Sequence, residues 1–419
     1  MTTVAGPEEQ PRPWSERLAG ALSHRNYRLL WFAALGSTIG TWMQSYAQGW
    51  LIFDLTKSNF FLGLDSFLGQ LPILLLMLIG GVIADRHDKR RLLTGSQYTQ
   101  AFAAMMLAGL VATGHITLPL IFLLSFVAGC GQAFGGPAYQ AMIPSLVPRR
   151  DLPNAIALNS TQFNLSRVLG PVAGGIVLAG IGVAGCFFLN GLSFFLVVIA
   201  LASLQLPAHI PNANPRALKE ELRGGLHYVK ENRLLFLLTI MAFVTTFLAM
   251  PVSTFLPAFA AEFLKGSQAP EKRLAMLMAS QGLGAIVGAL MIGSIGRFKH
   301  MGRALLGGQI CLALFVAAFA ASRSLPLSLV LIFFAGISSM AVFSMSFSLV
   351  QLTVPDDLRG RVVSIYMVAL RGGWPLGALI SGALADKFTA PVVITANCLV
   401  LSLLAGVLLL RKHGTLNQV

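Results

Sequence analysis

The chain has 419 residues, of which 55% are hydrophobic and only 11% are charged, and its mean hydropathy is +0.74. A soluble domain cannot hide so much apolar surface, so the composition excludes a water-soluble fold and indicates a bilayer as the solvent. The formal net charge is +14. Because Lys and Arg gather in alternate loops rather than on one face, we exclude a nucleic-acid surface and expect no nucleic-acid partner.

Residues 1–25 are polar, contain Pro and lack the apolar stretch of a cleavable signal peptide, so we predict a cytoplasmic N-terminal tail. After them, apolar stretches of roughly 20 residues recur, each long enough to cross the hydrocarbon as a helix. These predicted spans begin near Arg28, Phe60, Leu92, Leu118, Asn154, Cys186, Leu234, Leu274, Ala304, Leu327, Val362 and Val392. Most Lys and Arg residues fall on one side of this arrangement, which predicts that both termini are cytoplasmic.

Acidic residues are scarce inside the spans. Of the 16 Asp and Glu residues, Asp65 comes closest to a deep position, about five residues below the outer end of the second span. If transport is coupled to protons, Asp65 is the predicted proton carrier. The alternative is a helix-end acid in contact with solvent. No histidine lies in the middle of a span, so a histidine relay is not expected.

The loop between the second and third spans carries an acid followed by four bases, in the pattern Gly81-x-x-x-Asp85-Arg86 and on to Arg90 and Arg91. A small residue such as Gly81 lets another helix approach closely. Asp85 can accept hydrogen bonds from a helix N-terminus or pair with Arg86 or Arg90. Such contacts form in one state of a gate and break in the other, so we predict that these five residues form a gate. The alternative is that the basic loop only fixes orientation.

Two arginines, Arg167 and Arg371, fall inside predicted spans, each roughly 15–20 Å deep. An arginine at that depth costs at least about 2.5 kcal/mol, so it should face a cavity or an anion. The alternative is a guanidinium bonded to carbonyls that Pro171 or Pro375 leaves free. Because no acidic residue lies at the same depth to neutralise these two arginines, we predict an anionic or acid-bearing substrate rather than a simple cation.

The second half of the chain echoes the first. Pro148-Arg149-Arg150-Asp151-Leu152 resembles Pro355-Asp356-Asp357-Leu358-Arg359, and Arg167-Val168-Leu169-Gly170-Pro171 resembles Arg371-Gly372-Gly373-Trp374-Pro375. A weaker echo of the charged loop, Gly293 to Arg303, makes Arg297 the candidate gate residue of the second half. Offsets near half the chain length predict two similar six-helix halves.

These boundaries give an N-terminal six-helix bundle at 26–206, a linker at 207–233, a C-terminal six-helix bundle at 234–411 and a short tail at 412–419. The linker begins with a Pro- and Asn-rich segment. Its later part has apolar residues at helical spacing among charges, which predicts an amphipathic helix on the cytoplasmic membrane surface. We expect it to bridge the halves, with regulation or docking as the alternative.

From Asn26 to about Lys412 the chain resembles the major facilitator superfamily, in the branch of bacterial enterobactin exporters and macrolide or multidrug efflux proteins. The resemblance rests on Asn26-Tyr27-Arg28-Leu29-Leu30-Trp31, the charged loop, Pro137-Ala138-Tyr139-Gln140, Asn154-Ala155, Gly170-Pro171-Val172-Ala173-Gly174-Gly175 and Leu256-Pro257-Ala258-Phe259-Ala260. The fourth span departs from this family because it lacks the arginine that many proton-driven antiporters carry. The resemblance implies a multi-pass protein of the bacterial inner membrane that acts as a monomer.

The resemblance also implies a central cavity lined by the first, fourth, seventh and tenth spans. Candidate substrate-binding residues, besides the two arginines, are the polar and aromatic side chains Gln44, Tyr46, Gln48, Gln132, Phe134 and Trp374. Gln44 and Gln48 share one helical face. Adaptable Met and aromatic walls suit bulky ligands. For each residue the alternative is lipid contact or helix packing.

The sequence thus predicts an all-α integral membrane protein with twelve transmembrane helices in two pseudo-symmetric bundles. We expect it to export an amphipathic, acid-bearing small molecule, siderophore-like or drug-like, by alternating access with proton coupling. The alternatives are a lipid or lysolipid flippase, an importer of the same fold, and a non-transporting scaffold. The four cysteines have no metal spacing, and no nucleophile or metal cluster lies at membrane depth, so we expect no enzyme activity, metal or cofactor.

Overall fold

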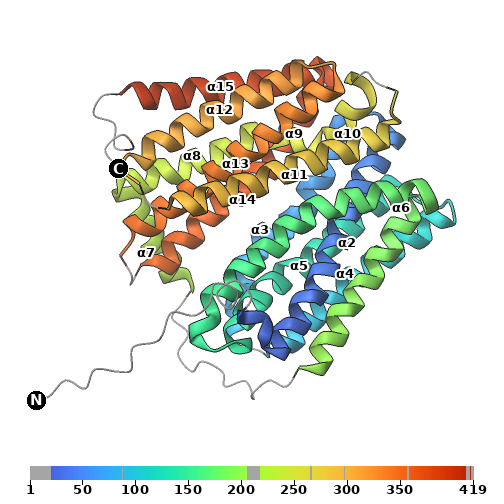
Figure 1. Ribbon diagram of the computed structural model, residues 1–419, viewed down its shortest axis with the longest axis horizontal. Helices are drawn as coiled ribbons and strands as arrows, with labels where there is room; N and C mark the ends of the chain where they lie inside the picture. Colours follow the sequence, from blue (N-terminus) through green and yellow to red (C-terminus); the bar gives the residue numbers. More distant parts are fainter. Residues whose placement is uncertain are drawn as a thin grey trace, which may run out of the picture.

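The computed structural model describes residues 20–86, 88–204, 218–264, 267–296, 298–355, 358–411 and 416, and it describes only the backbone of residues 77–86 and 218–223. The described chain is helical apart from short connections. Its helices form two bundles, one from each half of the sequence, which touch along one end (Figure 1). The prediction of an all-α fold with two similar halves is therefore confirmed.

The N-terminal half begins with a short 3-10 helix and continues through long helices. Its elements are η1 (Gly20–Ser23), α2 (Arg25–Thr56), α3 (Asn59–Arg86), α4 (Lys89–Ala112), α5 (Leu118–Leu146), η2 (Arg149–Asp151) and α6 (Leu152–Ser203). The last of these, α6, has 52 residues and contains a break at Gly182, where φ is +74° and ψ is −174°. Only glycine adopts this backbone conformation readily. The break divides α6 into two arms, at 152–181 and 183–203.

The C-terminal half includes one helix that is interrupted twice. Its elements are α7 (Leu218–Glu231), α8 (Arg233–Ala249), α9 (Pro251–Thr254), α10 (Leu256–Ala258), the π-helical turn η3 (Phe259–Phe263), α11 (Pro270–Ile295), α12 (Met301–Ala321), α13 (Leu325–Thr353), α14 (Arg359–Phe388) and α15 (Ala390–Leu410). Pro251 and Pro257 open the two short pieces that follow α8, because proline has no N–H for the helical ladder.

Nine helices of the described chain are long and apolar enough to cross a membrane. α6 counts once among them although it has two arms, and α2 and α4 have the length but a more polar composition. If both arms, α2 and α4 are counted as spans, the total is the twelve that the sequence predicts. That total stays a prediction.

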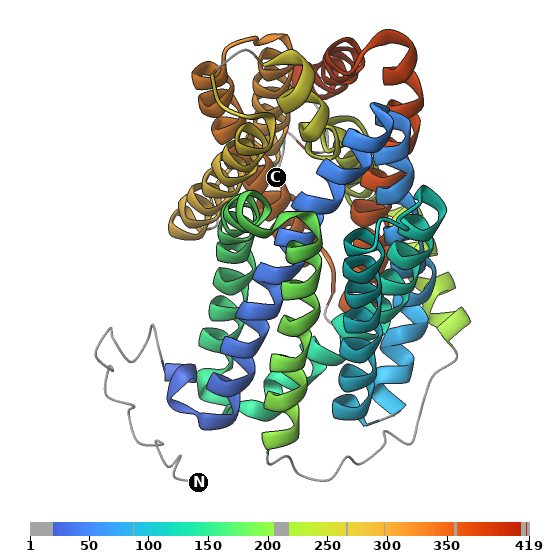
Figure 2. The same cartoon turned by 90° about the vertical axis from the view of Figure 1, so that its right-hand side faces the viewer.

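All spans run between the same two sides of the molecule, and we name these sides by the chain ends. The terminal side carries the start of α2, the end of α6 and the end of α15. The far side carries the end of α2, the break in α6 and the start of α15. In Figure 1 the two bundles meet at the far side and diverge toward the terminal side, and Figure 2 shows the same arrangement turned by 90°.

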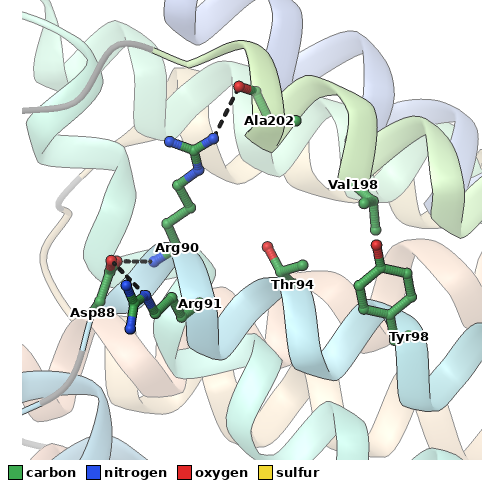
Figure 3. Close-up of a pocket in the computed structure, with 7 residues that line it drawn as sticks. All are labelled: Asp88, Arg90, Arg91, Thr94, Tyr98, Val198 and Ala202. Carbon is green, nitrogen blue, oxygen red and sulfur yellow. Dashed lines mark hydrogen bonds and ion pairs between the residues drawn. The ribbon is translucent and has the colours of Figure 1, made fainter.

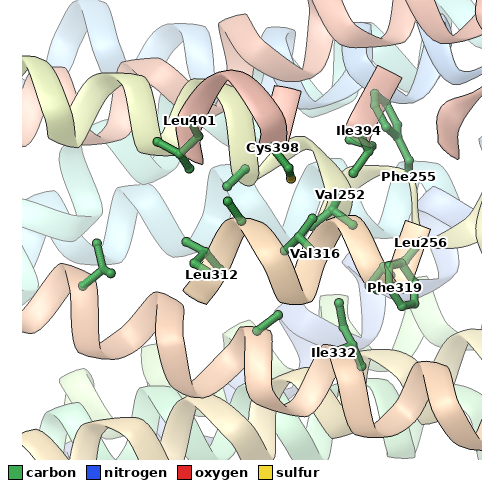
Figure 4. Close-up of a cluster of buried hydrophobic side chains, with 14 of the residues drawn as sticks. Val252, Phe255, Leu256, Leu312, Val316, Phe319, Ile332, Ile394, Cys398 and Leu401 are labelled. Atoms are coloured by element: carbon green, nitrogen blue, oxygen red, sulfur yellow. The ribbon is translucent and has the colours of Figure 1, made fainter. Parts of the chain in front are cut away.

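The largest buried apolar cluster includes side chains from both halves, and a second cluster lies in the N-terminal half. In the C-terminal half, side chains from the interrupted helix and from α12, α13 and α15 interlock, among them Phe255, Phe319, Ile332 and Ile394, each fully buried (Figure 4). In the N-terminal half, the start of α2 is tied to the start of α6, because Tyr27 donates to the Ala155 carbonyl at 2.8 Å and the Trp31 indole donates to the Leu158 carbonyl at 3.0 Å.

Candidate functional site

The two halves touch at the far side through backbone-to-backbone contacts of α3 with α14. A Cβ atom on Gly63 would lie 2.3 Å from the Ala378 carbonyl oxygen, and one on Gly382 would lie 2.6 Å from the Asn59 carbonyl oxygen. Only residues without a side chain allow two helices to approach so closely. This helix pair is therefore a tight seam between the halves.

Hydrogen bonds reinforce the seam. The Asp386 carboxylate on α14 accepts from the backbone N–H of Asn59 at 2.7 Å and from the Ser58 hydroxyl, at the start of α3. A second seam lies between α2 and α6 of the N-terminal half and α11 of the C-terminal half, where the Tyr46 hydroxyl on α2 donates to the Glu271 carbonyl on α11 at 2.8 Å. Tyr46 is only 1% exposed. In this conformation it is part of the seam, and its predicted role in substrate binding stays a prediction.

Toward the terminal side the halves separate. On α2, a Cβ at Gly49 would meet Pro257 of the C-terminal half at 3.5 Å. Ser45 and Thr41 lie one and two turns nearer the terminal side on the same face, and both are exposed. This face of α2 thus touches the C-terminal half at the far side, and the same face is exposed nearer the terminal side. The conformation is closed at the far side and open at the terminal side.

Arg167 and Arg371 lie on the helices of the two seams, one in each half. Arg167 is on the first arm of α6, where its carbonyl oxygen would lie 3.2 Å from a Cβ on Gly282 of α11. Arg371 is on α14 beside Gly372, where a Cβ would lie 3.7 Å from Leu74 of α3. The two arginines therefore lie on matching helices of the two halves, each at or next to a contact between the halves.

Neither arginine has an acidic partner among the described residues. The Arg167 guanidinium lies over the Trp42 ring, 5.4 Å from its centroid, and Trp42 in turn makes an edge contact with Phe163 at 6.0 Å. Arg371 is exposed in the structure. No hydrogen bond or ion pair to either guanidinium occurs within the described chain, so the carbonyl-bonded alternative has no support there. An arginine above an aromatic face keeps its donors available for an anion.

Asp65 is not an isolated acid in contact with solvent, because its carboxylate accepts hydrogen bonds at the end of a buried polar cluster. The Gln48 amide donates to both Asp65 carboxylate oxygens at 2.9 Å and to the Ser125 hydroxyl at 2.8 Å. The Ser125 hydroxyl donates to Asp65 Oδ1 at 2.6 Å. Three helices, α2, α3 and α5, therefore meet at this carboxylate.

The cluster extends through α2 into the second arm of α6. Gln44 donates its amide N–H to the Gln48 carbonyl at 3.3 Å, and Asn190 donates to the Gln44 carbonyl at 2.6 Å. All three amides point their N–H groups toward Asp65. An ionised carboxylate only accepts hydrogen bonds, so it fixes this direction along the whole chain. We call these four residues, Asp65, Gln48, Gln44 and Asn190, the amide chain.

The other predicted substrate-binding residues are not all brought together. Gln132 lies seven residues after Ser125, about two turns along the same face of α5, and it is exposed on the terminal side of the amide chain. Phe134 lies on the opposite face of α5, so it does not share a surface with Gln132. Trp374, one turn from Arg371, donates its indole N–H to the Thr254 hydroxyl of α9 at 3.0 Å.

The interrupted helix is a second polar junction. Gln281 of α11 donates to the Ser253 hydroxyl of α9 at 3.0 Å. With the Trp374 bond, this ties α9 to both α11 and α14, the helices that form the two seams. Interrupted helices in transporters commonly surround the substrate site because their free backbone groups line a cavity. The interrupted helix is therefore bonded to both helices through which the C-terminal half meets the N-terminal half.

The predicted gate residues are only partly described. The structure gives no side-chain placement for Gly81, Asp85 and Arg86, and Arg297 lies outside the described residues. Arg90 donates to the Ala202 carbonyl at 2.9 Å at the end of α6, within its own half. Arg91 lies 3.8 Å from the Asp88 carboxylate, and its side chain is 90% exposed. A gate contact between the halves at this loop stays a prediction.

Several residues of the site were missed from the sequence. Ser125, Asn190, Gln281 and Asp386 each make one of the contacts described above. Asn190 and Gln281 could have been found, because amides inside apolar spans need partners. Ser125 gives no such signal, since a serine can bond to its own helix. In the sequence Asp386 is a helix-end acid, and only the position of α3 beside it shows that it accepts hydrogen bonds from the other half.

The profile of the family described as transmembrane secretion effector matches residues 18–416. The chain therefore belongs to this family of the major facilitator superfamily, as the motifs indicated, and it is a multi-pass membrane protein of a transporter family.

Named relatives cover most of the chain. It is 27% identical to the multidrug efflux pump Tap of Mycolicibacterium fortuitum, with 85% of this chain and 88% of that protein covered. It is 23% identical to macrolide efflux protein A of Streptococcus pyogenes, with 87% and 91% covered. It is 25% identical to the enterobactin exporter EntS of Escherichia coli O1:K1 / APEC, with 95% and 94% covered.

Solved structures show the same fold at low identity. The nucleoside transporter NupG aligns with a TM-score of 0.69 at 16% identity, covering 92% of this chain and 97% of that one. A bacterial homologue of the lysosomal transporter Spinster aligns with a TM-score of 0.69 at 16% identity, covering 92% and 89%. A mutant form of the peptide transporter POT aligns with a TM-score of 0.73 at 12% identity, covering 96% and 98%.

Proposed function

We propose that this protein is a secondary active transporter that exports an amphipathic, acid-bearing small molecule by alternating access, in exchange for protons. The observation that carries the proposal is the pair of matching arginines, Arg167 and Arg371, which lie next to contacts between the halves and have no acidic partner in the described chain. A cation at membrane depth is costly without a counter-charge, and an acid-bearing substrate supplies one.

The two seams support the proposal of alternating access. The far side is closed by glycine contacts and by Asp386, while the face of α2 below them is uncovered. With the terminal side in the cytoplasm, as the basic loops predict, this conformation loads substrate from inside. Rocking the halves about the arginines would break the contacts of Gly63 and Asp386 and open the far side. The efflux and export functions in the names of Tap, macrolide efflux protein A and EntS support this direction.

Proton coupling is assigned to Asp65 and the amide chain. When Asp65 takes up a proton, one of its carboxyl oxygens becomes a donor, and that oxygen can no longer accept from Gln48 in the same way. If the Gln48 amide turns its oxygen toward this O–H group, Gln44 and Asn190 can turn in the same sense. In this proposal, protonation on α3 changes hydrogen bonding as far as the second arm of α6.

The substrate class is tested with purified protein in proteoliposomes. Flux of matched anionic, zwitterionic and cationic amphiphiles is measured with and without a pH gradient. We expect the anionic compound to have the highest flux. We expect this flux only when the pH gradient drives protons in the direction opposite to the substrate. Permanently cationic dyes moving as preferred substrates, with anions excluded, would contradict the proposed substrate class. Retention of all compounds would contradict transport itself and favour a scaffold.

Alternating access is tested at the glycine seam. Gly63→Val forces a side chain into the Ala378 carbonyl, and overpacking of about 1–3 kcal/mol should disfavour the far-side-closed state and lower flux about tenfold or more. Gly406→Val is the matched control, because no atom lies within 4 Å of its Cβ position. Labelling of a Thr41→Cys variant by an impermeant thiol reagent should fall with Gly63→Val. Equal flux and labelling in both glycine variants would refute the seam as a gate.

A further inference from the structure

A groove with a polar and an apolar part lies on the outer surface of the N-terminal half, with its polar part between α4 and the second arm of α6 and its apolar part along α4. Its polar part has a volume of about 560 Å³ and is lined by Asp88, Arg90, Arg91, Thr94, Tyr98, Val198 and Ala202 (Figure 3). The bond from Arg90 to the Ala202 carbonyl closes one end of this hollow, and Tyr98 faces Val198 at the other end.

The lining of the hollow consists mainly of hydrogen-bond donors. Arg90 and Arg91 bring two guanidinium groups, and Thr94 and Tyr98 bring hydroxyl groups, with the Thr94 side chain directed into the hollow (Figure 3). The one acid, Asp88, is already engaged, because it accepts from the Arg90 backbone N–H at 2.9 Å and lies 3.8 Å from the Arg91 Nε atom. Guanidinium forks beside hydroxyl groups match the oxygens of a phosphate group.

The depth of the hollow is that of lipid headgroups. α4 has 24 residues, so it is about 36 Å long, slightly longer than the roughly 30 Å of hydrocarbon. Arg90, Arg91 and Thr94 lie in its first two turns, which places them at the terminal edge of the bilayer. Tyr98 follows one turn deeper, at the boundary where tyrosine rings gather.

An apolar track continues from the hollow along α4. Phe102 is 56% exposed and Met106 is 41% exposed, and both follow Tyr98 at helical spacing. A second hollow of about 360 Å³ runs along this track and is lined by Phe102, Met105, Met106, Gly109, Leu110 and Thr113. The groove is therefore basic at one end and apolar along the rest.

We propose that this groove binds one anionic phospholipid, with its phosphate between Arg91 and Thr94 and an acyl chain along Phe102 and Met106. A free phosphate would fit the basic end alone and leave the apolar track without a ligand. A phospholipid satisfies both parts, since its phosphate is joined to an acyl chain that runs along the membrane normal, as α4 does. The proposal depends on the membrane location and not on the transport function.

The test uses full-length purified protein in detergent, titrated with phosphatidylglycerol or with phosphatidylcholine of the same acyl chains. Native mass spectrometry counts the lipids that each protein retains. We expect one phosphatidylglycerol per chain, held about tenfold more tightly than phosphatidylcholine. The double variant Arg91→Gln, Thr94→Val should remove this preference.

Arg303→Gln is the control, because Arg303 is an exposed arginine at the terminal-side start of α12, outside the groove. It should retain phosphatidylglycerol as the unchanged protein does. Phe102→Gln, which alters only the apolar track, should weaken phosphatidylglycerol about threefold or more. Thermal unfolding without added lipid checks that each variant is folded.

Three outcomes would overturn the lipid site. The first is equal retention of both lipids by the unchanged protein, and the second is unchanged preference in the Arg91→Gln, Thr94→Val variant. The third is inorganic phosphate that displaces phosphatidylglycerol at equal concentration while Phe102→Gln has no effect, which would assign the basic end to a free anion.

Discussion

In the N-terminal half a carboxylate, Asp65, ends a chain of amide hydrogen bonds that connects α3, α2 and α6, whereas the C-terminal half joins its helices through isolated neutral pairs. Gln309 donates to Thr245 at 2.8 Å, and Asn397 donates to Ser381 at 2.9 Å, and neither pair reaches an acid among the described residues. The carboxylate at the end of the amide chain can change its charge, whereas these two pairs of the C-terminal half are fixed dipoles.

The halves are alike in one respect, which is the position of their arginines. Arg167 and Arg371 lie on matching helices of the two seams, so recognition of a negative charge is shared between the halves. The difference suggests a division of work, in which both halves hold the substrate and only the N-terminal half couples it to protons.

The largest expected effect comes from the feature that the halves share. Arg167→Leu and Arg371→Leu should each weaken binding of an anionic substrate by roughly 10- to 100-fold, because a hydrogen bond to a charged group contributes about 1.5–3 kcal/mol. The measurement is the apparent affinity for an acid-bearing compound and for its neutral ester.

The ester should be affected much less in both variants, and lysine at either position should restore part of the affinity. If only one of the two leucine variants changes anion binding, the equivalence of the two arginines fails. Equal losses for acid and ester would assign the arginines to packing.

A smaller effect is expected where the halves differ. Gln48→Ala removes the amide that donates to both oxygens of Asp65 and should lower pH-gradient-driven flux about fivefold. Gln281→Ala removes a neutral pair with Ser253 in the C-terminal half. It should change driven flux and gradient-independent exchange by the same factor.

The readout is the ratio of driven flux to exchange in proteoliposomes. Gln48→Ala should lower this ratio, and Gln281→Ala should leave it unchanged. A ratio that falls equally in both would show that coupling is not confined to the N-terminal half.

The smallest effect is expected at the end of the amide chain. Asn190→Ala removes one neutral hydrogen bond to Gln44, two amides away from Asp65, so driven flux should fall only about twofold. Asn397→Ala in α15 is the matched change in the other half. The measurement is the ratio of driven flux to exchange in each variant. If Asn397→Ala lowers this ratio as much as Asn190→Ala does, Asn190 has no specific role in proton coupling.

Much of the fold could be predicted from the sequence, because hydrocarbon imposes strong constraints on each span. The helical stretches and the two halves followed from apolar length and from the echo of Arg167 in Arg371. The family followed from the charged loop and the motif that ends in Gly174 and Gly175.

The site was less predictable, since it depends on which helices become neighbours. Asp65 and Gln48 were both named from the sequence, but in different roles, and nothing in their spacing joins a carboxylate on α3 to an amide on α2. Tyr46 was named as a ligand contact, and its burial against α11 depends on how the two halves meet. Phe134 lies opposite Gln132 because residues two positions apart on a helix point to opposite faces. This spacing is visible in the sequence, so the two residues need not have been assigned to one binding surface.

The assignment of coupling to Asp65 is tested most directly by measuring proton movement during export. Purified protein in proteoliposomes is given an anionic substrate, and a pH indicator on the opposite side of the membrane reports protons while substrate flux is followed. The unchanged protein should move protons against the substrate. Asp65→Asn should keep substrate exchange, move no protons and lose its response to a pH gradient. Full pH-gradient-driven export by Asp65→Asn would contradict the role of Asp65.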